Sequence, residues 1–151
     1  MRGWRGHGRE AIAYVFPDHR PFFERAAVEI EKPTTLLLGA IGTLREYECI
    51  ADHVGEGDLD RNALVIARAL GERGFSILAQ QSTRLLGVGR ALTAYVSPDA
   101  AAALARFAAN RTAHPILRAY FARHPDLAEA LEPLVDAADR TLRSGARALV
   151  A

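Results

Sequence analysis

Nine arginines between Arg61 and Arg123 form the part of this 151-residue sequence best suited to chemistry with anions. Only two acidic residues, Glu72 and Asp99, interrupt this segment, so its net charge is +7. A guanidinium group offers paired hydrogen-bond donors to phosphate and carboxylate oxygens. Such contacts to nucleic acid weaken steeply as salt is added. The segment thus predicts a surface that neutralises phosphates, formed from Arg61, Arg68, Arg84, Arg90, Arg106, Arg111, Arg118 and Arg123.

The preceding segment, residues 21–60, has the opposite charge. It holds nine acidic residues against Arg25, Lys32 and Arg45, which gives it a net charge of −6, whereas the whole chain carries +1. Oppositely charged blocks either pair with each other inside one fold or leave a basic face for an anionic partner. The sequence leaves both arrangements open.

The first residues, MRGWRGHGRE, combine arginine, glycine and one aromatic side chain. This composition suits flexible contacts to single-stranded nucleic acid, in which charge and base stacking act together. The contacting residues would be Arg2, Trp4, Arg5 and Arg9. Because glycine disfavours regular helix, the alternative is a loose terminal tail, and we expect residues 1–20 to form a flexible arm.

A second nucleic-acid signal lies within residues 77–95. The run Leu86-Gly87-Val88-Gly89-Arg90 resembles the turn of the helix-turn-helix motif of bacterial regulators. The resemblance implies a recognition helix that begins near Arg90 and offers only this basic side chain to a groove. Arg84 and Arg90 are both expected as nucleic-acid contacts of the basic segment. The sequence departs from the motif at Ser82, Thr83 and Thr93, where the family carries small or apolar residues. The alternative is a single kinked core helix over residues 75–96.

One pair of residues suggests enzymatic chemistry. Arg118 precedes His124 by six residues, a spacing similar to that of the helical ribonucleases of the HEPN group. The resemblance implies a nuclease that uses these two side chains, although Ala119 replaces the polar residue usual in the family. The alternative is a cationic histidine that interacts favourably with a helix C-terminus. We favour this structural role, and we predict no catalytic residue and a protein that is not an enzyme.

The sequence predicts no cofactor or metal site. Its five histidines are scattered, and no carboxylate and histidine have the Glu-x-x-His spacing of a di-iron bundle. Cys49 is the only cysteine, which excludes an intramolecular disulfide and fits a reducing compartment. The sequence shows neither a secretory signal nor an apolar run long enough to cross a membrane, so we expect a cytoplasmic protein.

Apolar residues at three- and four-residue steps predict an all-α fold. The clearest run extends from Leu37 to Val54, and the starts of later helices are marked by Ser97-Pro98-Asp99, Pro115 and Pro125. We expect an antiparallel helical bundle of six to seven helices, with residues 21–151 as one domain. Residues 36–41 and 91–96 are short apolar runs that strands could also form.

Function follows from this architecture as a hypothesis. A helical bundle can hold a small apolar ligand or a partner helix in a groove, so we predict a binding or regulatory module. We also expect it to be a homodimer, because two-fold oligomers are common. The nucleic-acid-binding protein is the first alternative, and the HEPN-like ribonuclease is the second. The expected groove residues are Leu44, Tyr47, Leu85, Leu92, Tyr95 and Phe107.

Overall fold

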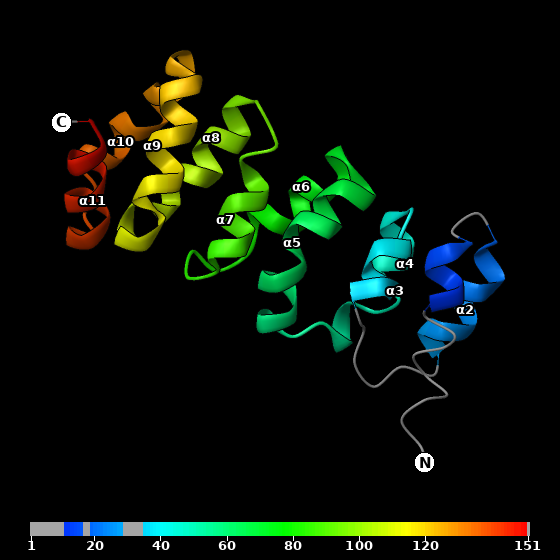
Figure 1. Ribbon diagram of the computed structural model, residues 1–151. Helices are drawn as coiled ribbons and strands as arrows, with labels where there is room; N and C mark the ends of the chain where they lie inside the picture. Colours follow the sequence, from blue (N-terminus) through cyan, green and yellow to red (C-terminus); the bar gives the residue numbers. More distant parts are fainter. Residues whose placement is uncertain (1–10, 17–18, 29–34, 151) are drawn as a thin grey trace. The chain divides into compact units, whose positions relative to one another are not determined.

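A computed structural model describes residues 11–16, 19–28 and 35–150, and every regular element in this part of the chain is helical (Figure 1). The predicted all-α class is therefore confirmed. The chain divides into two compact units, residues 1–74 (unit 1) and 75–151 (unit 2). Of the predicted arm, residues 11–15 are helical, whereas residues 1–10 lie outside the described part. Within the described residues, no helix has the length and apolar character needed to cross a membrane.

Unit 1 is built around helix α5, against which α3 packs. Its elements are α2 (Arg20–Val28), α3 (Thr35–Ala40), α4 (Leu44–Glu48), the 3-10 turn η1 (Ala51–His53) and α5 (Glu56–Leu70). Helix α3 contacts both α2 and α5. Leu37, Leu38, Ile50 and Ile66 are fully buried in the core of unit 1. Of the predicted apolar stripe, Leu37, Ala40, Ile41 and Tyr47 are buried, whereas Leu44, Ala51 and Val54 are half-buried.

The continuous helix predicted from Leu37 to Val54 is wrong. The helix stops after Ala40, and Thr43 begins a new one in a capping box. The Thr43 hydroxyl accepts a hydrogen bond from the backbone N–H of Glu46, at 3.3 Å. In return the Glu46 carboxylate accepts from the backbone N–H of Thr43, at 3.0 Å. This exchange satisfies donors that a helix start leaves free, so it stabilises a break between two short helices.

Helix α5 is tied to α3 by a buried amide and ends before Gly71. Asn62 accepts a hydrogen bond from the Thr35 hydroxyl at 2.7 Å and donates one to the carbonyl of Asp58 at 2.8 Å. Gly71 follows the last helical residue with a φ of 55°, a left-handed conformation that glycine adopts without steric cost. The sequence predicts a helix from about Leu59 to Glu72 with Gly71 and Gly74 marking its end, whereas the observed helix runs from Glu56 to Leu70.

Unit 2 consists of short α-helices joined by 3-10 segments. They are α7 (Leu86–Leu92), α8 (Pro98–Ala105), η2 (Arg106–Ala109), η3 (Arg111–Ala113), α9 (His114–Arg123), η4 (Pro125–Leu131), α10 (Glu132–Val135) and α11 (Arg140–Val150). Helix α6 (Glu72–Ala79) spans the boundary between the units. Neither residues 36–41 nor residues 91–96 form a strand, and the ambiguous runs enter α3 and α7.

Local signals in unit 2 predict helix starts better than helix lengths. Ser97 caps α8 as expected, because its hydroxyl accepts from the Ala100 N–H at 3.1 Å and Pro98 follows it. The helix predicted to continue to Ala113, however, becomes 3-10 after Ala105. The predicted single helix over residues 75–96 is also wrong, since α6 ends at Ala79 and α7 begins at Leu86.

In unit 2, helix α11 packs directly against η2. Both elements lie at the yellow-to-red end of the chain in Figure 1 and contact each other directly. A Cβ atom built on Gly145 of α11 would overlap the backbone carbonyl oxygen of Ala108 in η2. Ala108 and Ala146 at this contact are completely buried. Only a residue without a side chain allows the two backbones to come this close.

We expect Gly145→Ala to destabilise unit 2 by about 1–3 kcal/mol, because the added methyl must push α11 away from η2. Urea denaturation followed by circular dichroism measures this free energy of unfolding. Gly57→Ala is the matched control, since nothing lies within 4 Å of a Cβ at that helical position. The control should be neutral or slightly stabilising. Equal stability of the two variants would contradict the proposed close contact.

Candidate cationic surface and cavities

All nine arginines of the basic segment are exposed. Arg61, Arg68 and Arg73 belong to unit 1. The remaining six, here called the unit 2 arginines, are Arg84, Arg90, Arg106, Arg111, Arg118 and Arg123. Asp99 is the only acidic residue between Arg84 and Arg123, so this stretch of unit 2 carries a local net charge of +5.

The elements that carry the unit 2 arginines are neighbours. Helix α9, with Arg118 and Arg123, contacts both η2 and η3, which carry Arg106 and Arg111. Helix α7, with Arg90, contacts η3. The segment before α7 is tied to the start of η3, because the Asn110 amide donates to the Thr83 carbonyl at 3.2 Å. The fold thus brings into contact elements whose arginines are spread over forty residues of the sequence.

The side chains of four of these arginines are uncommitted. Within the described part of the chain, Arg84, Arg90, Arg111 and Arg123 form no side-chain hydrogen bond or ion pair. Two others bind backbone carbonyls: the Arg106 guanidinium donates to Ala79 at 3.0 Å and that of Arg118 to Ala148 at 3.2 Å. In unit 1, Arg61 pairs with Asp58, one helical turn earlier.

The predicted helix-turn-helix is wrong, because the break between the helices does not fall where the motif requires its turn. Residues 86–90, expected to form the turn, lie inside α7, and the break falls at residues 80–85. The two glycines of this run, Gly87 and Gly89, do not stop the helix. The ring of Phe107 packs against the space beside Gly89. The other predicted nucleic-acid contacts, Arg2, Trp4, Arg5 and Arg9, lie outside the described residues.

A cavity of about 410 Å³, here called the α11 cavity, opens between α11 and the η2–η3 region. Its polar lining comes from Arg111, His114, Arg140, Thr141 and Ser144. Small residues complete it: Ala108, Ala109, Gly145 and Ala148. Both cavity arginines are exposed, and neither forms an ion pair among the described residues. The lining contains no acidic side chain.

The histidine of the α11 cavity is held in one orientation. The His114 Nε2 atom lies 2.9 Å from the Ala108 carbonyl oxygen. Because a carbonyl oxygen only accepts hydrogen bonds, Nε2 of His114 is the donor in this contact. The other ring nitrogen, Nδ1, does not take part in it. The Asp139 carboxylate, which does not line the cavity, caps α11 by accepting from the N–H groups of Thr141 and Leu142, at 2.7 and 3.0 Å. The nearest acid in the sequence is therefore already engaged.

Sequence reasoning missed the α11 cavity, although it placed Arg111 in the basic surface. Arg140, Ser144 and Ala148 lie four residues apart and so share one face of α11. That spacing, with Gly145 beside it, is a signal for a helix face of small and polar residues. The spacing does not reveal which element packs against this face of α11, because η2 and η3 lie about thirty residues earlier in the chain.

The predicted apolar groove residues do not line any of the three cavities described here. Tyr47, Leu92 and Phe107 are buried, and Leu44, Leu85 and Tyr95 are half-buried. Leu44 and Tyr47 belong to unit 1 and the other four to unit 2. A groove that uses them remains a prediction.

A different cavity, of about 610 Å³, lies between α9, η4 and the end of α11, and its charged lining residues are Arg118, Glu129 and Glu132. Its apolar lining includes Phe121, Leu131, Leu149 and Val150. Arg118 also lines it, but the structure gives His124 a separate environment, with its ring 4.9 Å from that of Tyr120. Among the described residues no contact joins Arg118 to His124, so the HEPN-like ribonuclease remains a prediction.

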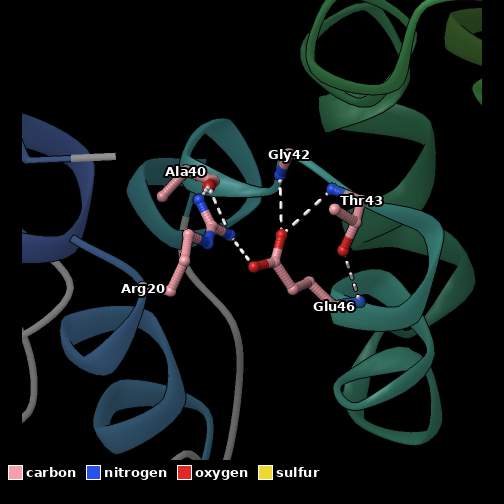
Figure 2. A network of polar contacts seen from close by, with 5 residues as sticks. All are labelled: Arg20, Ala40, Gly42, Thr43 and Glu46. Carbon is pink, nitrogen blue, oxygen red and sulfur yellow. Dashed lines mark hydrogen bonds and ion pairs between the residues drawn. The ribbon is translucent and has the colours of Figure 1, made fainter. Parts of the chain in front are cut away.

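Unit 1 contains a polar network that links three of its helices (Figure 2). Arg20 of α2 forms an ion pair with Glu46 of α4 and donates to the Ala40 carbonyl at the end of α3, at 3.4 Å. Glu46 also accepts from the Gly42 N–H at 2.9 Å. A cavity of about 480 Å³ adjoins this network, and its lining includes both charges and Cys49. Because every charge drawn in Figure 2 has a partner, the network is structural.

The electrostatic surroundings of Glu46 agree with this interpretation. Burial opposes its ionisation, but the hydrogen bonds from Arg20 and Gly42 and the charge of Arg20 outweigh burial, so the pKa of Glu46 lies below its usual value. Burial raises the pKa of the hydroxyls of Tyr47, Tyr95 and Tyr120, so these groups stay protonated at neutral pH. Among the described residues, no group of three or more His, Cys, Asp or Glu side chains could hold a metal ion.

No family model, curated protein or solved structure matches this chain.

We expect Glu46→Gln to lower the free energy of unfolding by about 1–2 kcal/mol at neutral pH, since a charged hydrogen-bond acceptor is lost. The carboxylate contributes stability above its unfolded pKa, and this contribution disappears as the pH falls through the lower folded pKa. The difference between wild type and variant should therefore vanish in acid. Denaturant titrations between neutral and acidic pH measure it, with the exposed Glu48→Gln as control. A difference that persists at low pH would contradict the role of the charge.

Proposed function

We propose that this chain is a nucleic-acid-binding module whose contact surface lies in unit 2. The observation that carries the proposal is the exposure of all six unit 2 arginines on elements that contact one another. Nucleic acids are the polyanions that such arginines suit, because guanidinium groups bind phosphate oxygens in pairs.

The chemistry of binding would be dominated by phosphates. Four uncommitted guanidiniums avoid the cost of breaking an existing ion pair before they contact a strand. The aromatic side chains of unit 2 are not exposed, since Phe107, Tyr120 and Phe121 are buried and Phe75 and Tyr95 are half-buried. This favours contacts to the phosphate backbone over base stacking. Binding would then depend little on sequence and strongly on salt.

Affinity for a labelled oligonucleotide should fall steeply between about 50 and 200 mM salt. Arg84→Gln and Arg90→Gln should each reduce the slope of log affinity against log salt by about 1, because each removes one phosphate contact. Fluorescence anisotropy over a salt series measures both. Arg25→Gln, an exposed arginine on α2 of unit 1, is the control and should leave the slope unchanged. An affinity independent of salt would rule the proposal out.

A second candidate function is supported by the cavity beside α9, η4 and α11. Its volume of about 610 Å³ falls within the range of about 300–1,000 Å³ found for small-molecule pockets. Phe121, Leu131 and Leu149 supply the apolar contacts that such a ligand requires. A binding module for a small apolar ligand would use this cavity in place of the groove expected from the sequence.

An uncharged apolar dye such as Nile red tests this second function. Val150→Asp should weaken dye binding by about tenfold, because it places a charge at the apolar lining. Val96→Asp is the matched control, since Val96 is 62% exposed and Val150 60% exposed, and only Val150 lines the cavity. Fluorescence titration of the folded variants measures the affinity. Equal binding by both variants would exclude this cavity as the site.

A further inference from the structure

The α11 cavity brings two arginines together with other polar side chains. Arg111 and Arg140 are exposed, and both line the cavity with His114. Thr141 and Ser144 add two hydroxyls whose side chains have no partner among the described residues. Five polar side chains that carry at least two positive charges, and no acid, converge on one cavity.

A phosphate monoester satisfies this set of groups better than a phosphate inside a strand. A monoester carries a charge of about −1.5 to −2 near neutral pH and presents three terminal oxygens. A phosphodiester carries a single charge and two free oxygens, and its two ester bonds must leave the cavity in opposite directions. Two guanidiniums and two hydroxyls therefore match the charge and the acceptors of the monoester.

The size of the cavity sets what can accompany the phosphate. Its volume of about 410 Å³ exceeds that of a phosphate group and falls within the range of about 300–1,000 Å³ typical of small-ligand pockets. Gly145, Ala108 and Ala148 leave room because their side chains are small or absent. The cavity can thus admit a terminal phosphate together with part of the attached nucleoside.

We infer that the α11 cavity binds a phosphate monoester, either the phosphorylated end of a nucleic-acid strand or a free mononucleotide. The strand-end source rests on the proposed function, since the other unit 2 arginines would then bind the phosphates that follow. Arg111 and Arg140 contact the phosphate oxygens. His114, which is held by its hydrogen bond to the Ala108 carbonyl, lines the same cavity.

The test compares three oligonucleotides of one sequence with a 5′-phosphate, a 3′-phosphate or hydroxyls at both ends, and AMP as the free monoester. We expect one phosphorylated end to bind at least about tenfold more tightly than the hydroxyl ends, because charged hydrogen bonds are gained. Arg140→Gln and Arg111→Gln should each abolish this ratio. Arg123→Gln, which removes an exposed arginine outside the cavity, should weaken all three strands equally and keep the ratio.

The outcomes separate this inference from the proposed function. Equal, salt-dependent binding of all three strands without AMP binding overturns the cavity inference and leaves the proposed function intact. AMP binding that Arg140→Gln abolishes, without binding of any strand, supports the cavity inference and contradicts the proposed function. A preference for phosphorylated ends that survives both Arg111→Gln and Arg140→Gln also overturns the inference.

Discussion

The packing of α11 against η2 is the constraint on which the rest of unit 2 depends. At Gly145 the helix meets the backbone carbonyl of Ala108, and no side chain separates the two backbones. The same two residues line the α11 cavity, so the contact between α11 and η2 also forms part of the wall of this cavity. Since interiors are packed as densely as crystals, a shift of α11 would change the position of every side chain on the cavity face.

The two units use charge in different ways. In unit 1, Arg20 and Glu46 neutralise each other and connect three short helices, and the capping box makes the same carboxylate part of a helix start. In unit 2, the guanidiniums of Arg84, Arg90, Arg111 and Arg123 have no such partner among the described residues. Charge that is paired fixes local structure, whereas exposed unpaired charge contributes little to stability and remains free for a partner.

Local chemistry explains which features the sequence could predict. Ser97-Pro98 and Gly71 act within one helical turn, so the start of α8 and the end of α5 could be read directly. Thr43 and Glu46 also form a local signal, but the apolar repeat that runs past them concealed the break. The α11 cavity could not be predicted, because Arg111 and Arg140 are brought together by tertiary packing and no periodicity relates them. Exposure of the arginines is likewise a property of the fold.

Under the proposed function, the exposed arginines and the α11 cavity would have different roles. Exposed charges attract a polyanion from a distance and tolerate many strand positions, which favours rapid and unselective association. A cavity lined by several donors discriminates, because a group with too few acceptors leaves some of those donors without a partner. Arg111 belongs to both sets, since it lies on η3 among the unit 2 arginines and also lines the cavity. Arg111 would therefore take part both in the general attraction of a strand and in the recognition of one particular phosphate.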